Sequence, residues 1–410
     1  MRLLIRHFLL PLVPWAMLAV AVWRRISGTE PPDALPERLG HSTAPTGPTI
    51  WLHGASNGEL ASARWVIAAL LADRPGLSVL VTCNTLTART MVQAWTLPRV
   101  TAAFAPLDLR GPLARLLASW QPKAQITVEG EIYPRRFAAC AAAGVPVVLI
   151  GARISERSFR GWMELQPVMA QALAYVRLAS AQDDASGQRL CALGLPAEVM
   201  RAVCDLKAVA IGQLPPPKIA ATTDARATCL LAASTHEGEE AIVLDAFQSQ
   251  TQFTQLILAP RHPRRADAVA ALVKARGIGL SRRSAGAMPG DHPVFLADTM
   301  GEMDLWYARA GACFVGGSFA RRGGHTPWEP ARFGSAILHG PHVQNFADPY
   351  RALDGAGGAV ALHAPDQLAA ALSGLDAARQ QALAGAAAQI LRASGTGADL
   401  IHAILTVADL

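Results

Sequence analysis

Residues 49–85, TIWLHGASNGELASARWVIAALLADRPGLSVLVTCNT, carry the clearest indication of a fold class in this chain. The stretch begins and ends with short runs rich in β-branched and other apolar residues, at 49–56 and 77–85. Between them, residues 59–74 are rich in alanine and leucine, which favour a helix. A strand, a helix and a second strand in this order are typical of two parallel strands joined by a crossover helix.

The same alternation continues on both sides of a proline-rich segment. Further β-rich runs of the first series are 124–131, 145–153 and 176–182, and a second series is 228–235, 255–262, 294–300, 312–318 and 336–341. Between the series lies GQLPPPKIAATTDAR, which predicts a stiff linker over 212–226. We therefore expect an α/β protein with two doubly wound domains, at 35–211 and 227–410, facing across a cleft. Their ligands should lie at the carboxyl ends of the strands.

Composition limits the class of protein. The chain has 410 residues, too many for one ordinary core, and it is 51% hydrophobic and 17% charged, as expected of a folded protein. A net charge of +6 favours anionic partners, namely nucleic acid, anionic lipid or phosphate-bearing substrates. Six scattered cysteines without a C-x-x-C pair predict free buried thiols in a reducing compartment, and exclude a disulfide framework or a cysteine zinc site.

The N-terminal 28 residues form a separate apolar segment. FLLPLVPWAMLAVAVW, residues 8–23, is uncharged and flanked by arginines, and as a helix it would reach about 24 Å, short of a hydrocarbon core of about 30 Å. It could be a tilted anchor with snorkelling arginines, a helix lying in the membrane interface, or a cleaved signal peptide. We favour a membrane-anchor helix over 1–28, and hydropathy alone does not separate spanning from lying flat.

Acidic residues follow two strands of the first series. Glu59 falls in the first turn of the helix after the first strand, where it can stabilise the helix N-terminus or act as a general base. Glu129 and Glu131 are two residues apart, so in an extended strand they would share a face. Such a pair could bind a cation, serve as an acid and base, or cap a turn.

Basic residues follow the next strand and close the first domain. ARISERSFRGW, residues 152–162, contains three arginines, which are either a solvated face or a site for an anionic acceptor. Lys207 is a lone cation near the expected linker.

Polar turns follow the individual strands of the second series. Ser234 with Glu237 has the spacing of a capping box, and Arg261 with His262 follows the next strand. FVGGSFARRGGHTPWEP, residues 314–330, combines glycines that expose backbone N–H groups, two arginines, and Glu329 near a helix expected to begin at Pro327. This loop fits a nucleotide, with arginines for phosphate and a carboxylate for ribose, although it matches neither of the common glycine-rich phosphate motifs.

Taken in order, these motifs resemble one family. HGASNGE, EGEIYP, ARISERSFRG, LK, ASTHEGEE, PRHP, DTMGE and FVGGSFARRGGHTPWEP…GPHVQNFAD, between about residues 35 and 350, are similar to motifs of the 3-deoxy-D-manno-octulosonic acid (Kdo) transferases of lipopolysaccharide synthesis. The resemblance implies the GT-B fold, with an acceptor domain followed by a CMP-sugar domain. It implies transfer of Kdo from CMP-Kdo to a lipid A precursor with inversion.

The resemblance also implies roles for individual residues. Glu59 would be the general base, and Glu129 and Lys207 would stabilise the transition state. The CMP-binding residues would be Pro260, Arg261, Met300, Gly301, Glu302, Thr326, Pro327, Trp328 and Glu329. Candidate acceptor contacts are Ser56, Arg157 and Arg160. Thr326 stands where asparagine is usual in the family, and Trp328 where leucine is usual, so a contact at 326 would use its backbone N–H group.

The expected partners follow from this resemblance. They are CMP-Kdo, a lipid A precursor and the cytoplasmic face of the inner membrane, with no nucleic acid. We expect no cofactor and no metal, because the donor has one phosphate and the sequence has no Asp-x-Asp motif. Two alternatives stay open, a related sugar-nucleotide enzyme with another acceptor and a catalytically silent nucleotide-binding membrane protein.

Overall fold

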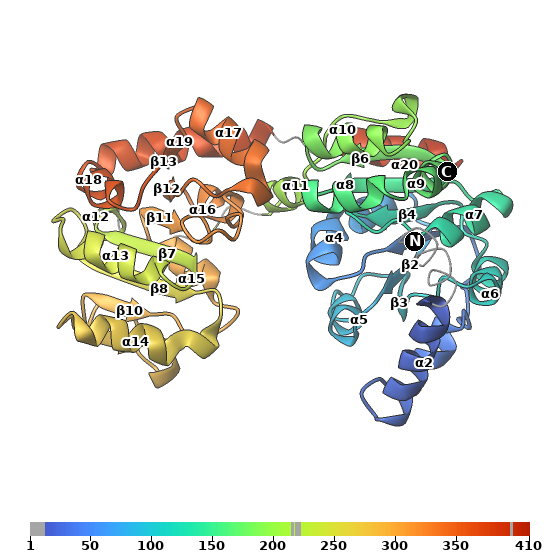
Figure 1. Ribbon diagram of the computed structural model, residues 1–410, viewed down its shortest axis with the longest axis horizontal. Coiled ribbons are helices and arrows are strands. Elements are labelled where there is room, and N and C mark those ends of the chain that lie inside the picture. Colours follow the sequence, from blue (N-terminus) through green and yellow to red (C-terminus); the bar gives the residue numbers. More distant parts are fainter. Residues whose placement is uncertain (1–12, 215–216, 218–222, 394–396) are drawn as a thin grey trace. The chain divides into compact units, whose positions relative to one another are not determined.

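The computed structural model describes residues 13–214, 217, 223–393 and 397–410. Contacts divide the chain into two compact units, a first unit of Met1–Ala210 with Thr396–Leu410 and a second unit of Ile211–Gly395. Figure 1 shows that each unit is a sheet covered by helices. This agrees with the two doubly wound domains predicted from the alternation of strands and helices.

The first unit has a parallel sheet with strand order β3-β2-β1-β4-β5-β6. Its strands are β1 (Thr49–His53), β2 (Ser78–Cys83), β3 (Val100–Phe104), β4 (Gln125–Val128), β5 (Val147–Ala152) and β6 (Val176–Ala181). The chain runs outward from β1 to β3 and then returns to pair β4 with the other side of β1. The strand order therefore reverses between β1 and β4, which is the switch point where ligands of such sheets bind.

Both faces of this sheet are buried. Successive residues of a strand point to opposite faces, so one strand contributes side chains to two core clusters. Ile50 and Leu52 contribute to one core cluster and Trp51 to another. The helices of this unit are α2 (Val13–Ile26), α3 (Ala34–Arg38), α4 (Asn57–Asp73), α5 (Leu86–Gln93), α6 (Arg110–Trp120), α7 (Pro134–Ala142), α8 (Glu156–Met163), α9 (Gln166–Leu173), α10 (Asp184–Ala192) and, running past Ala210, α11 (Leu206–Gly212). Strand β3 was missed in the sequence, because an edge strand with one partly exposed end lacks a continuous apolar run.

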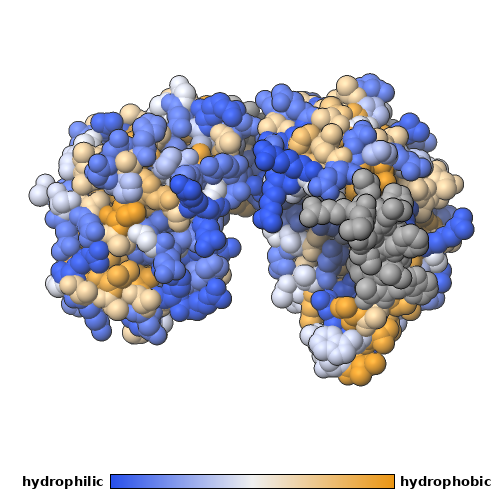
Figure 2. Space-filling model, viewed as in Figure 1, coloured by the Kyte–Doolittle hydropathy of each residue, from blue (hydrophilic) through white to orange (hydrophobic). Residues whose placement is uncertain are grey.

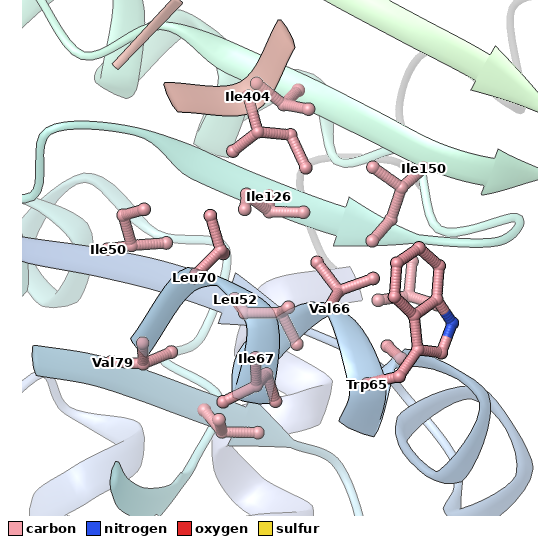
Figure 3. Packing of buried hydrophobic residues seen from close by; sticks show 14 of the residues in the cluster. Ile50, Leu52, Trp65, Val66, Ile67, Leu70, Val79, Ile126, Ile150 and Ile404 are labelled. Carbon is pink, nitrogen blue, oxygen red and sulfur yellow. The ribbon is translucent and has the colours of Figure 1, made fainter. Parts of the chain in front are cut away.

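The C-terminal helix α20 (Ala398–Val407) packs on the first unit. Its apolar face joins the cluster that also contains α4, and Figure 3 shows Ile404 pointing toward Ile126 of β4. The predicted second domain, 227–410, therefore extends too far at its C-terminal end. An apolar helical stripe shows that a helix covers a sheet, but it does not specify which sheet.

The second unit has a parallel sheet with strand order β13-β12-β11-β7-β8-β10-β9. Its strands are β7 (Cys229–Thr235), β8 (Gln255–Pro260), β9 (Leu280–Arg282), β10 (Val294–Leu296), β11 (Ala312–Val315), β12 (Ala336–His339) and β13 (Ala359–Ala361). Its helices are α12 (Thr223–Ala227), α13 (Glu239–Gln248), α14 (Ala266–Ala275), α15 (Met303–Arg309), α16 (Trp328–Arg332), α17 (Ala347–Gly355), α18 (Gln367–Ser373) and α19 (Ala377–Ala393). Here the order reverses between β7 and β11.

Two segments predicted from the sequence lie partly outside the described residues. The linker 212–226 includes 215–216 and 218–222, which are not described, and its described ends belong to α11 and α12 rather than to an extended chain. The anchor segment includes residues 1–12, also not described.

The described part of the anchor segment is α2. Trp23 and Ile26 of this helix are 64% and 79% exposed, and Figure 2 shows apolar surface over its end. Within the part of the chain that the structure describes, no helix has both the length and the apolar character needed to cross a membrane.

Candidate active site

Glu59 lies beside the switch point of the first sheet. Helix α4 begins directly after β1, and Ser56 is its N-cap residue, with a hydroxyl that accepts the Glu59 N–H at 3.4 Å. The Glu59 carboxylate turns back over the helix start, where it accepts the N–H of Ala55 at 2.6 Å and the hydroxyl of Ser56 at 3.0 Å. Glu59 thus makes the stabilising contacts of a helix-start residue, and its side chain remains partly exposed.

The environment of Glu59 suits proton acceptance. Burial raises the pKa of its carboxyl, and the negative charges of Glu129 and Glu131 raise it further. The hydrogen bonds from Ala55 and Ser56 lower this pKa and so oppose the shift. A carboxylate with a raised pKa is a stronger base than an exposed one. The surroundings of Glu59 therefore suit a general base, and the same carboxylate also makes the capping contacts.

Glu129 and Lys207 are paired at the same edge of the sheet. Glu129 follows β4, and its carboxylate lies 3.3 Å from the ammonium of Lys207. Asp205 caps the start of α11 by accepting the N–H of Lys207 at 2.9 Å, which fixes the lysine backbone. Glu129 has φ of 57°, a conformation that non-glycine residues seldom adopt and that is concentrated at functional sites. The structure therefore brings together the predicted catalytic pair.

The expectation that Glu129 and Glu131 share a strand face is wrong. Strand β4 ends at Val128, and the left-handed turn at Glu129 takes the chain out of the sheet. Glu131 instead accepts a hydrogen bond from the hydroxyl of Tyr133, which also accepts the side-chain N–H of Asn84 at 3.3 Å. The guanidinium of Arg136, which is fully buried, lies 4.0 Å from the centre of the Tyr133 ring. Sequence reasoning missed these supporting residues because Asn84 comes from a segment about 50 residues before Tyr133 and Arg136.

The candidate acceptor arginines lie on the surface of the first unit. Helix α8 buries none of its residues, and both Arg157 and Arg160 are exposed. Arg160 is paired with Glu156 one turn earlier at 3.0 Å. Their role in acceptor binding stays a prediction.

The predicted CMP residues lie at the carboxyl edge of the second sheet. Pro260 ends β8, and Arg261, whose backbone N–H donates to Thr235 at 3.0 Å, has an exposed side chain. Met300 is 70% exposed and Gly301 forms the bend before α15 with φ of 84°.

The carboxylate of Glu302 is already occupied within the protein. It accepts hydrogen bonds from Arg283 at 2.6 Å and from the hydroxyl of Thr299. Arg283 is the main cause that lowers the pKa of this carboxyl to about 2. Any contact of Glu302 with a nucleotide is therefore best made by its backbone.

The expectation that the glycine-rich loop offers its backbone N–H groups to a ligand is wrong for Gly316 and Gly324, which donate to backbone oxygens at 2.8 and 2.9 Å, and for Gly317. The N–H groups of Gly317, Phe319 and Ala320 donate to the carboxylate of Glu239 at 2.7, 2.9 and 3.1 Å. Glu239 is 1% exposed, so this anion site is filled by the protein itself. The sequence could not reveal this, since about 80 residues separate the carboxylate from the loop.

The end of the loop has the predicted helix start. Pro327 is the N-cap residue of α16, and Trp328, which is 3% exposed, begins the helix. The Thr326 hydroxyl accepts the Trp328 N–H at 3.3 Å, and Glu329 accepts the hydroxyl of Tyr307 at 3.1 Å. The backbone N–H of Trp328 is thus committed to its own turn.

The predicted capping box of Ser234 and Glu237 is also wrong. Helix α13 begins at Glu239 with Gly238 as the N-cap residue, and Ser234, with φ of 54°, still belongs to β7. The carboxylate that returns to the start of this turn is that of Glu239, which accepts the backbone N–H of His236 at 2.9 Å. A bend at Ser234 delays the helix beyond the position that the spacing suggested.

The metal-binding side chains and one cavity of the described residues bear on where a ligand could lie. Among the residues that the structure describes, no group of three or more histidine, cysteine, aspartate or glutamate side chains could hold a metal ion. A cavity of about 490 Å³ in the second unit is lined by Cys229, Gln255 and Pro293, at the amino ends of the strands. Ligands of such sheets bind at the opposite edge, where the predicted residues lie.

Comparison with solved structures identifies the fold. The Anabaena protein Alr3699/HepE in complex with UDP has a TM-score of 0.60 at 13% identity, covering 89% of this chain and 100% of that chain. The UDP-GlcNAc 2-epimerase of Neisseria meningitidis has a TM-score of 0.56 at 12% identity, covering 88% and 99%. At these identities the likeness concerns the fold alone, and that fold is GT-B.

Comparison with known sequences identifies the family. Residues 33–210 match the family model described as 3-deoxy-D-manno-octulosonic-acid transferase (kdotransferase). The 3-deoxy-D-manno-octulosonic acid transferase of Bordetella pertussis is 37% identical over 392 residues, 89% of this chain and 90% of the relative. That of Haemophilus influenzae is 32% identical over 325 residues, 77% and 75% of the two chains. These two relatives cover most of the chain at more than 30% identity, and this chain therefore belongs to the family of Kdo transferases.

Proposed function

We propose that this protein transfers Kdo from CMP-Kdo to a hydroxyl group of a lipid A precursor, with inversion and with Glu59 as the general base. The observation that carries the proposal is the grouping of Glu59 with the paired Glu129 and Lys207 at one switch point. The relatives named as Kdo transferases support the same reading.

The chemistry needs one base and charge stabilisation. The acceptor hydroxyl attacks the anomeric carbon of Kdo, the bond from that carbon to the CMP phosphate oxygen breaks, and the hydroxyl proton passes to Glu59. A carboxylate suffices because the hydroxyl becomes acidic only as the new bond forms. Lys207 supplies a fixed positive charge, held by Glu129, against the negative charge that develops during transfer.

The donor is assigned to the second unit, at the residues named above. Arg261 has an exposed guanidinium that suits a phosphate, and Glu302 would contact CMP through its backbone because Arg283 holds its carboxylate. CMP-Kdo has a single phosphate, and we propose that transfer needs no metal and no cofactor.

The acceptor and the membrane are assigned to the first unit. Arg157, Arg160 and Ser56 would contact the anionic lipid acceptor, and α2 would bind the cytoplasmic face of the inner membrane. The exposed Trp23 and Ile26 beside Arg24 and Arg25 support this, since aromatic and basic residues favour the membrane interface.

A transfer assay tests the reaction. The full chain is incubated with CMP-Kdo and a tetraacylated lipid A precursor, and the product is analysed by mass and by the anomeric configuration of the added sugar. We expect addition of Kdo with inversion. Absence of product with CMP-Kdo, or transfer from another sugar nucleotide alone, would refute the proposal.

A truncation tests the membrane assignment. Deleting residues 1–25 removes most of α2, including Arg24, but keeps the buried pair of Glu30 and Arg38 at 2.9 Å. We expect a protein that no longer sediments with membranes and still binds CMP. Sedimentation of the truncated protein at high salt would assign membrane binding to another surface.

A further inference from the structure

Glu239 collects an unusual set of hydrogen bonds. Its carboxylate accepts four backbone N–H groups, those of Gly317, Phe319 and Ala320 in the glycine-rich loop and that of His236 in its own turn. All four partners are donors without acceptor capacity, and the residue is 1% exposed. The carboxylate is therefore committed to the protein backbone and is not available to a ligand.

These bonds join the two turns that flank the switch point of the second sheet. One turn, 236–239, follows β7, and the other, 317–320, follows β11, its neighbour in the sheet. At Gly316 a side-chain carbon would lie 2.5 Å from the backbone oxygen of Ser234, so the two backbones approach too closely for any other residue. The carboxylate of Glu239 is the anion that holds this backbone-to-backbone contact together.

The junction continues to the segment expected to bind CMP. The imidazole rings of His236 and His325 lie in parallel planes, with an interplanar angle of 1°, and meet through their Nε2 atoms, which are 3.0 Å apart and within hydrogen-bond distance. His325 directly precedes residues 326–329. Tyr350 donates to the backbone oxygen of His325 at 3.0 Å, and Asn345 donates to that of Arg322 at 2.8 Å. The loop is thus fixed at several points between Gly317 and His325.

We propose that Glu239 is a positioning residue of the donor site, acting through His236 and His325 on residues 326–329. This inference rests on the proposed function, because it assumes that the second unit binds the nucleotide. Glu239 does not touch the donor. It keeps the loop in the arrangement that binds CMP, and a protein whose competent arrangement is less populated binds its ligand more weakly by the same factor.

The number of donors explains why a carboxylate is required. Glutamine at 239 would offer one oxygen acceptor, and its NH₂ group would face backbone N–H groups that it cannot satisfy. Buried donors left without a partner favour arrangements in which they meet water. Glu239→Gln, which is nearly isosteric, should therefore loosen the loop without emptying the space that the side chain fills.

Glu240 provides a matched control. It is the next residue and 0% exposed, and its partners are Arg265 at 2.6 Å and the hydroxyl of Thr235 at 2.9 Å. These partners lie outside the glycine-rich loop. Glu240→Gln therefore alters an equally buried carboxylate, but it leaves the hydrogen bonds between Glu239 and the loop intact.

The experiment measures CMP binding by calorimetry in the full-length protein and in its Glu239→Gln and Glu240→Gln variants, with thermal unfolding as the folding control. Glu239→Gln should raise the CMP Kd about tenfold, as expected if the competent loop falls to about a tenth of the population, and Glu240→Gln should leave it within about twofold. The donor KM should follow the Kd, and the acceptor KM should stay unchanged.

His236→Phe is a milder second variant. It keeps an aromatic ring at this position and removes the contact between the Nε2 atoms, so the CMP Kd should rise several-fold in a folded protein. Unchanged CMP affinity in folded Glu239→Gln overturns the inference. If that variant does not fold, unchanged affinity in His236→Phe overturns it instead. A wild-type protein that does not bind CMP would refute the donor assignment itself, which is a separate result.

Discussion

The two sheets use the same backbone arrangement at their switch points and attach different chemistry to it. In the first unit the turns after β1 and β4 carry Glu59 and Glu129, and in the second unit the turns after β7 and β11 carry His236 and the glycine-rich loop. Each site has a non-glycine residue with positive φ at a strand end, Glu129 at 57° and Ser234 at 54°. The fold therefore supplies the place, and the side chains set the chemistry that each place can perform.

The two sites also differ in how their carboxylates are held. Glu59 takes its contacts from residues three and four positions earlier, so its arrangement is local to one helix start. Glu239 takes three of its four contacts from a loop about 80 residues later. A site held by local contacts tolerates distant substitutions, whereas the arrangement around Glu239 depends on correct folding of the whole second sheet.

The largest effect should come from Glu59. Glu59→Gln keeps the shape of the side chain but removes the proton acceptor, so kcat should fall about 100- to 10,000-fold. CMP affinity should hardly change, since the nucleotide is assigned to the other unit. Turnover and CMP binding are measured on one preparation, with thermal unfolding as the control. Near-normal turnover of the folded variant would leave Glu59 with its capping role alone.

Arg261 should have the next largest effect, and on binding rather than turnover. Arg261→Ala should weaken CMP binding by about 1–3 kcal/mol, the range for a charge-assisted hydrogen bond. Calorimetric titration with CMP measures the loss, and Arg264→Ala, at another exposed arginine after the same strand, serves as the control. Equal losses in both variants would mean that general positive charge, and not Arg261, binds the phosphate.

Arg157 should affect the acceptor and leave the donor alone. Because this arginine is exposed, Arg157→Ala should raise the acceptor KM only about two- to fivefold, and the CMP Kd should stay the same. Initial rates at varied acceptor concentration provide the measurement. A change in CMP affinity would contradict the separation of the two sites.

The smallest effect should appear in the pH dependence of stability. Burial lowers the pKa of His325 to about 4. Between about pH 6.5 and pH 4, His325 is therefore protonated in the unfolded chain and neutral in the folded protein. The stability contributed by neutral His325 is present above this window and is lost as the pH falls through it. The Tm of the wild-type protein should be lower at pH 5.5 than at pH 7.5. In His325→Phe this difference in Tm should be smaller by about 2 °C. An equal decrease in Tm in both proteins would show that His325 does not contribute to the pH dependence of stability.

Much of the fold and part of the site could be predicted because they depend on local sequence. Apolar runs predict most of the strands. The polar residues that follow them include the candidate site residues Glu59, Glu129 and Arg261. The errors concern contacts between distant segments. No spacing rule connects Glu239 with Gly317, Arg283 with Glu302, or α20 with the first sheet, because each contact depends on how the finished units pack. The positive φ at Glu129, which moved Glu131 off the strand face, also has no signature in the residue type.

The return of α20 to the first unit affects the order in which the chain folds during synthesis. Leu400, Ile401, Ile404 and Leu405 belong to the core of the first unit, yet the ribosome makes them after the whole second unit. At about 5–20 residues per second, roughly ten to forty seconds separate the end of the first segment from α20. During that time the apolar surface around Ile126 and Ile150 lacks its cover. The unit that begins first is therefore completed last, and its nascent form is the stage most exposed to aggregation and most dependent on chaperones.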